Sequence, residues 1–169
     1  MKKNIYLIIA LLVMLGCQAE KDLDSIDTEN WLKRKIDISQ KDSLEYGKSY
    51  LSVYSQIYSF SQHEKYNLTG MISLRNTSDV DTIYLLKTEY FDTQGALLRT
   101  YFDSPIYLAP METTEIIIDQ KDVAGGTGSN FMFEWKIPPT CPEPLFEGVM
   151  ISMQGTQGLS FTTQAKRIR

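Results

Sequence analysis

The stretch Asn130 to Ile137, NFMFEWKI, decides the fold of this chain. Its large apolar residues alternate with other side chains, the apolar set being Phe131, Phe133, Trp135 and Ile137. Successive side chains of a β-strand point to opposite faces of a sheet. A period of two therefore predicts a strand with one face buried in a core and the other exposed.

The same period recurs through most of the chain after residue 45. One such run lies at residues 66–77, and the others are 49–60, 82–91, 96–102, 113–119, 147–154 and 159–168. Turn residues separate these runs, and Gly95 in FDTQGALL supplies the positive φ that a hairpin turn needs. Roughly seven to eight short strands with no long helical period predict an all-β, immunoglobulin-like β-sandwich, with a small up-and-down barrel as the alternative.

A different pattern begins the chain. Lys2 and Lys3 precede an uncharged run at residues 5–16, which fits a secretory signal peptide. The run is shorter than the roughly 20 apolar residues that a membrane-spanning helix needs. Residues 14–17, MLGC, resemble the lipobox of a bacterial lipoprotein, in which the cysteine is lipidated and becomes the new N-terminus. We therefore predict lipidation at Cys17, the alternative being a secreted protein in which this cysteine is incidental.

These patterns divide the chain into three parts. Residues 1–16 form the signal peptide, residues 17–45 a lipidated N-terminus and flexible tether, and residues 46–169 the sandwich domain. The tether is predicted from its high charge and low apolar content, although Trp31 could place one helical turn along the domain. The net charge of −4 without a basic stripe argues against a nucleic-acid partner.

Several stretches resemble a known family in order and spacing. They include SLRNTS, TEYFDTQGALLRTY and, as the most specific piece, the glycine-rich run that leads into Glu134 and Trp135. The resemblance is to the bacterial family called domain of unknown function 3124, over about residues 53–169. It implies an exported, small β-domain protein and no assigned activity.

Two groups of residues are candidate contact sites. Exposed amides in the glycine-rich loop could form a small nest for an anionic or sugar ligand, in a candidate ligand loop of Gly125, Gly126, Gly128 and Asn130. The competing interpretation is a plain strand connection that needs positive φ. Even spacing places Tyr50, Tyr54 and Tyr58 on one strand face, as a candidate contact face for a sugar or a protein. The competing interpretation there is the rim of a core.

Patterns typical of catalytic or metal centres are weak. The single histidine, His63, lies in a polar segment that we expect to be a loop, and no G-x-S-x-G motif occurs. Cys141 lies in PPTCPEP without a basic neighbour to activate its thiol. Asp119, Asp122 and Glu134 could approach one another and bind Ca²⁺, but surface acidity explains them equally well. We predict no catalytic residue, no metal site and no cofactor.

The sequence thus predicts a lipid-anchored, extracytoplasmic domain of the bacterial cell envelope, on the periplasmic or surface face of the outer membrane. We expect a non-enzymatic binding or assembly module whose partners are the membrane and an envelope protein or glycan. One alternative is a small hydrolase or metal-dependent enzyme with its site near residues 125–130. Another is a purely structural envelope protein.

Overall fold

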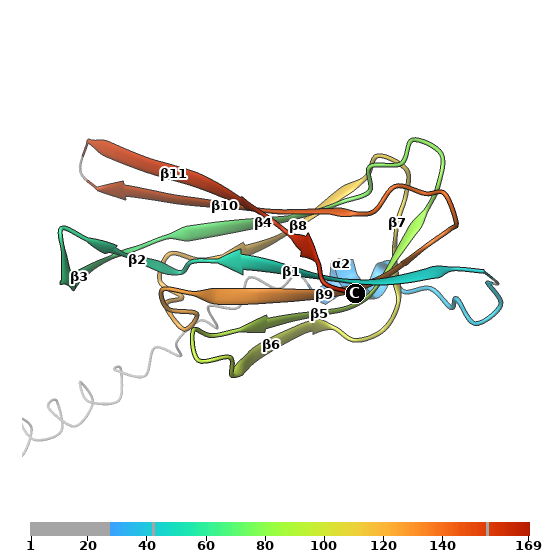
Figure 1. Cartoon of the computed structure of the whole chain (residues 1–169), viewed down its shortest axis with the longest axis horizontal. Helices are drawn as coiled ribbons and strands as arrows, with labels where there is room; N and C mark the ends of the chain where they lie inside the picture. Colours follow the sequence, from blue (N-terminus) through green and yellow to red (C-terminus); the bar gives the residue numbers. More distant parts are fainter. Residues whose placement is uncertain (1–27, 42, 155) are drawn as a thin grey trace, which may run out of the picture.

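Strand β9 (Ser129–Ile137) contains the alternating stretch and lies at the centre of the larger sheet (Figure 1). The computed structural model describes residues 28–41, 43–154 and 156–169. In β9 every second residue is buried, and the side chains of Phe131, Phe133 and Trp135 are fully enclosed. The predicted all-β sandwich is therefore confirmed, with the period of two as its cause.

The strands of the described residues form two main antiparallel sheets and a separate hairpin. The larger sheet has the order β12-β1-β9-β5-β6, with β7 also paired to β5. Its other strands are β1 (Glu45–Val53), β5 (Ile83–Phe91), β6 (Leu97–Phe102), β7 (Ile106–Leu108) and β12 (Lys166–Arg167). The smaller sheet, β11-β10-β4-β8, contains β4 (Thr69–Arg75), β8 (Thr113–Ile118), β10 (Leu145–Gln154) and β11 (Gln157–Gln164). The hairpin pairs β2 (Gln56–Ser59) with β3 (Ser61–Asn67).

Aromatic rings join the two sheets. The rings of Phe133 from β9 and Phe146 from β10 stack with centroids 4.0 Å apart, and Phe131 lies 5.7 Å from Phe133. Tyr90 from β5 stacks on Phe131 at 4.7 Å. Each large ring removes extensive apolar surface from water, so this row supplies much of the energy that holds the sheets together.

The Trp135 ring is enclosed by β1 and by the last residues of the chain. Gly47 in β1 leaves room for this ring, because a Cβ there would lie 2.2 Å from ring carbons. The Trp135 indole donates a 3.0 Å hydrogen bond to the Ser49 hydroxyl. The Arg167 guanidinium covers the same ring at 5.1 Å and forms an ion pair with Glu143. This basic end of the chain is thus used in packing.

The predicted hairpin at Gly95 is confirmed, but two local expectations were wrong. The Gly95 φ of 84° and the 2.9 Å hydrogen bond from the Asp92 amide to the Ala96 carbonyl define the turn between β5 and β6. The run at 49–60 is not one strand, because the chain breaks between β1 and β2. The segment around His63 is strand β3 of an exposed hairpin, not a loop. Its polar residues are solvated on both faces, so no apolar period indicated the strand.

The packed part of the chain begins before residue 46. Helix α2 (Thr28–Lys33) places Trp31 against Phe102 of β6, with ring centroids 4.9 Å apart and Trp31 only 6% exposed. The Ile36 amide then donates to the Pro105 carbonyl at 3.0 Å. The Arg34 side chain donates a 2.7 Å hydrogen bond to Glu112. This part of the predicted tether therefore lies along the sandwich.

The residues nearest the predicted anchor are not described. Cys17 and the rest of residues 1–27 lie outside the described part of the chain. Within that part, no helix has the length and apolar character needed to cross a membrane.

Candidate functional site

The candidate ligand loop is tightly built into the sandwich. Gly125 is buried, and a Cβ at this position would lie 1.9 Å from the Tyr90 hydroxyl and 2.7 Å from the Ser55 hydroxyl. Those two hydroxyls form a 2.8 Å hydrogen bond, and Tyr90 also donates to Ser129 at 3.2 Å. Burial raises the pKa of Tyr90, so this network is neutral. Gly125 is therefore required for close packing.

The polar groups of this loop are largely engaged by the protein itself. The Gly126 amide donates to the Val123 carbonyl at 3.0 Å, and the Gly128 amide donates to the Thr93 hydroxyl at 3.1 Å. The Gly126 carbonyl accepts hydrogen bonds from two successive amides, those of Ser55 and Gln56, at 3.1 and 3.0 Å. An anion nest needs amides that point outward, and these two amides point at internal acceptors.

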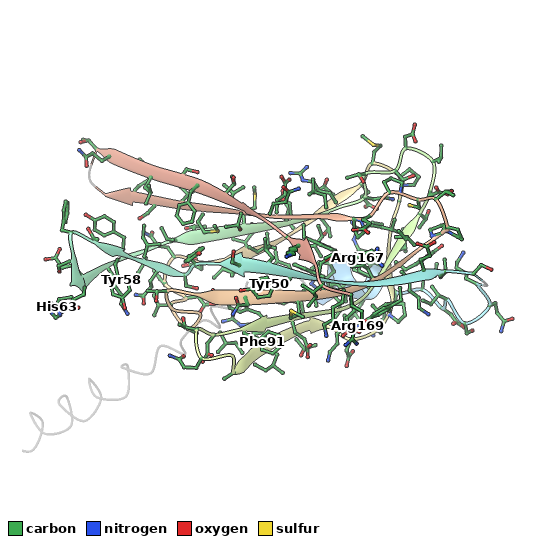
Figure 2. All side chains as sticks on the ribbon, in the orientation of Figure 1. Tyr50, Tyr58, His63, Phe91, Arg167 and Arg169 are labelled. Carbon is green, nitrogen blue, oxygen red and sulfur yellow. The ribbon has the colours of Figure 1, made fainter. Side chains whose placement is uncertain are left out.

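The three candidate tyrosines do not share one strand face. Tyr50 lies on β1, Tyr58 lies on β2, and Tyr54 lies in the break between them. Figure 2 shows Tyr50 over the larger sheet and Tyr58 near the end of the β2–β3 hairpin. The Tyr54 ring contacts Phe161 of β11 edge-to-face at 5.7 Å, so it packs against the core. The break between β1 and β2, where the Ser55 and Gln56 amides donate to the Gly126 carbonyl, explains why an even spacing did not give one face.

One contact joins the two candidate groups. The Tyr50 hydroxyl donates a hydrogen bond to the Asn130 Oδ1. The Asn130 amide nitrogen donates to the Gly128 carbonyl at 3.3 Å. Asn130 thus connects the loop to β1 with both ends of its side chain, and a ligand at either residue would compete with these contacts.

The three carboxylates weighed for calcium have separate partners. Asp122 forms a 2.5 Å ion pair with Arg99, Glu134 forms a 2.9 Å ion pair with Lys48, and Asp119 accepts the Lys121 amide at 2.8 Å. Hydrogen bonding to Lys48 lowers the pKa of Glu134, which favours its charged form. No group of three metal-ligating side chains occurs among the described residues.

Cys141, the cysteine within the described region, is buried. Its thiol donates weakly to the Pro142 carbonyl at 3.4 Å. Burial raises the pKa of Cys141, which keeps it in the less nucleophilic thiol form.

A groove lies at the junction of α2 and β6. It has a volume of about 310 Å³. Its lining combines rings, an aliphatic side chain and polar groups: Trp31, Leu32, Lys35, Tyr101, Phe102, Asp103 and Ser104. This volume is at the lower end of the range for small-ligand sites, roughly 300–1,000 Å³.

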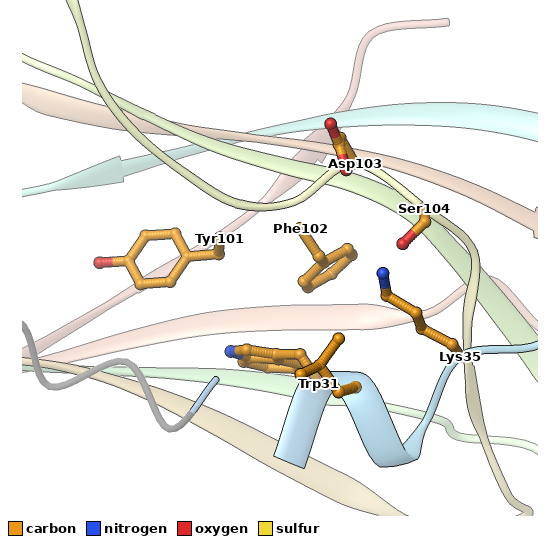
Figure 3. A pocket seen from close by; sticks show the side chains of 7 residues that line it. Trp31, Lys35, Tyr101, Phe102, Asp103 and Ser104 are labelled. Atoms are coloured by element: carbon orange, nitrogen blue, oxygen red, sulfur yellow. The ribbon is translucent and has the colours of Figure 1, made fainter. Parts of the chain in front are cut away.

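The polar side of the groove has an unsatisfied group. The Ser104 hydroxyl oxygen is buried and has no hydrogen-bond partner. Figure 3 shows the Lys35 amine directed toward Ser104, with Trp31 and Phe102 forming the opposite, apolar side. A buried hydroxyl without a partner carries a desolvation cost that a bound acceptor or donor would relieve.

The groove was not expected from the sequence. Its two halves are about 70 positions apart, and one half, residues 31–35, has the composition of a flexible tether. Trp31 was the one available signal, because a large ring is costly to leave exposed within a charged segment.

Comparisons with known proteins give a family and no activity. No curated protein matches the chain. Among solved structures, the crystal structure of Thermotoga maritima 1070 is similar with a TM-score of 0.45 and 11% identity, over 71% of this chain and 92% of that one. The family model described as "Protein of unknown function (DUF3124)" matches residues 46–168, in agreement with the resemblance seen in the sequence. The chain therefore belongs to the DUF3124 family of proteins of unknown function.

Proposed function

We propose that this protein is a lipid-anchored, extracytoplasmic binding module of the bacterial envelope. The MLGC pattern that ends at Cys17 supports the anchor, because it follows a short apolar run and precedes polar residues. Acyl chains attached at one residue would hold the sandwich at a membrane surface, each buried CH₂ contributing about 0.8 kcal/mol.

The groove between α2 and β6 is the proposed binding site. The observation that carries this assignment is the buried, unpartnered Ser104 hydroxyl beside the Lys35 amine in a mainly apolar cavity, whose remaining polar lining residue is Asp103. A few polar groups in a mainly apolar cavity are typical of sites that orient a ligand by hydrogen bonds and hold it by apolar contact.

The burial of the rings favours a peptide segment over a sugar as the ligand. Trp31, Tyr101 and Phe102 are each more than nine-tenths buried, so little ring surface remains for a sugar to stack on. An apolar side chain would lie in the groove against the exposed edges of these rings and Leu32, with a neighbouring carbonyl or carboxylate oxygen near Ser104 and Lys35. We therefore propose that an exposed segment of another envelope protein occupies the groove.

Fractionation tests the anchor. Cys17→Ala should move the protein from the membrane pellet to the soluble fraction, whereas Cys141→Ala, which removes the buried thiol, should leave it in the pellet. Retention of the Cys17→Ala protein in the pellet would contradict lipid attachment.

Site-specific photocrosslinking in cells tests the groove. A benzophenone amino acid at Leu32, on the groove rim, should give a discrete crosslinked product, and the same group at exposed Val80 should not. Adding Asp103→Trp, which places an indole at the exposed rim of the groove, should remove the product while leaving the unfolding midpoint within a few degrees. Identical products from both positions, or a product that survives Asp103→Trp, would refute the assignment.

A further inference from the structure

Two hairpins extend together from one end of the sandwich. Strand β10 pairs with β4 only as far as Ile151, and β2 pairs only with β3 (Figure 1). The hairpins are joined at their bases, because the Ser152 hydroxyl donates to the Asn67 carbonyl at 2.9 Å and Tyr54 contacts Phe161. They therefore form one feature, which we call the hairpin end.

The hairpin end carries exposed apolar side chains. Phe60, at the turn between β2 and β3, is 93% exposed, and Met153 of β10 is 64% exposed. The other exposed apolar residues here are Tyr58, Ile151 and Leu159. Singly exposed apolar residues are ordinary, but several on neighbouring hairpins mark a surface that another phase or molecule covers.

Charge distinguishes the hairpin end from the opposite end of the sandwich. The sequence has no charged residue from Ser49 to Gln62 or from Gly148 to Ala165, in a chain that is 22% charged. Strand β3 of the same end carries Glu64 and Lys65, which are exposed and of opposite charge. At the opposite end, beyond β4, exposed Val80 lies between Asp79 and Asp81. Moving charges into a bilayer is costly, so the uncharged turn at Phe60 and the uncharged β10–β11 hairpin suit insertion better than the turn at Val80.

We propose that the hairpin end inserts its apolar side chains into the surface of the bilayer to which the protein is anchored. This inference rests on the lipid anchor proposed above. Ten residues lie between Cys17 and Thr28, the start of α2, so eleven residue-to-residue steps connect the two. At about 3.3–3.6 Å per extended residue they reach at most about 40 Å, similar to the roughly 33 Å length of a ten-residue strand.

The anchor therefore keeps the sandwich domain within about one domain length of the membrane. The apolar side chains of the hairpin end then decide how the domain is oriented on the membrane. Phe60 and Met153 would enter the boundary between headgroups and acyl chains to a depth of about 5–10 Å. The polar neighbours, which are Ser, Gln and Thr residues together with Tyr58, suit the headgroup layer. Glu64 and Lys65 of β3 would remain at the level of the charged headgroups.

Depth-dependent fluorescence quenching tests this orientation in the full, lipidated chain. The native indoles of Trp31 and Trp135 are both buried, so Phe60→Trp adds the one exposed indole in the described residues. The protein is reconstituted in phosphatidylethanolamine–phosphatidylglycerol vesicles, with and without lipid brominated near the carbonyl end of the acyl chains. We expect about two-fold quenching of the added indole, none for Val80→Trp, and weaker quenching when Met153→Glu is combined with Phe60→Trp.

The remaining outcomes overturn the inference. Equal, weak quenching of Phe60→Trp and Val80→Trp in protein that sediments with the vesicles would refute insertion while leaving the anchor intact. Failure to sediment would instead refute the anchor. The vesicles are also prepared with one protein molecule each. If the quenching or the blue shift of the added indole disappears in these vesicles, the hairpin end contacts other copies of the chain and not the lipid. Unchanged unfolding midpoints show that each variant retains the fold.

Discussion

Replacing Trp31 with alanine tests whether the segment before the sandwich contributes to its stability. The Trp31 ring is almost completely buried beside Phe102. A buried tryptophan removes about 200 Å² from water, which at about 25 cal/mol per Å² is worth about 5 kcal/mol before other terms. Because α2 has only six residues, it can detach without unfolding the sheets, so the loss cannot exceed the docking free energy of the segment.

We therefore expect Trp31→Ala to lower the free energy of unfolding by about 2–4 kcal/mol. The measurement is urea denaturation followed by far-ultraviolet circular dichroism and by the fluorescence of Trp135. Leu32→Ala is the matched control on the same helix, because Leu32 is 60% exposed and its loss should cost at most about 0.5 kcal/mol. Trp31→Phe should recover part of the stability through its remaining ring. Equal, small effects of Trp31→Ala and Leu32→Ala would refute the docking.

Two further predictions concern packing and pH. Gly125→Ala should cost more than about 2 kcal/mol, because its Cβ would overlap the Tyr90 hydroxyl, whereas Gly128→Ala, with its nearest neighbour at 3.6 Å, should cost far less; similar thermal shifts for both would contradict this account. Burial opposes ionisation of Glu112, but hydrogen bonds from the Ala109 amide and Arg34 outweigh it and lower the pKa of Glu112. A carboxyl group whose pKa is lower in the folded than in the unfolded state stabilises the fold at pH values above the unfolded pKa of about 4.3. This stabilisation is lost as the pH falls through the folded pKa. The stability difference between wild type and Glu112→Gln should therefore be constant near neutral pH and shrink below about pH 4, and a pH-independent difference in unfolding midpoints would refute the assignment.

The predictable part of the fold is the part with one buried face. In β9 and β4 the apolar period of two identified the strands and their inward residues, because each inward position lies in the core between the sheets. Strand β3 has no such period, since neither of its faces is buried against a sheet. Its hairpin begins after the break at Ser55, whose amide donates to the carbonyl of Gly126, a residue distant in the sequence.

The candidate sites, too, were predictable only where the signal lies in neighbouring residues, and not where it depends on residues distant in the sequence. Glycine content drew attention to the loop at residues 125–128, but only the fold shows that the Gly125 backbone packs against the Tyr90 hydroxyl. Composition described residues 17–45 as a tether, because charge content does not show that Trp31 has a partner at Phe102. The groove was therefore not predictable from local patterns. Lipidation at Cys17 remains a prediction from the sequence.

The segment that follows α2 also shields a strand edge. Lys35 forms a bridge with Ile106 of β7, and the Tyr107 amide donates to the Arg34 carbonyl at 3.1 Å. A protein shortened to the residues of the family match would leave this side of β7 with unpaired backbone groups, and exposed edges of that kind recruit other chains. Recombinant versions intended for crystallisation or binding studies should therefore begin no later than Thr28.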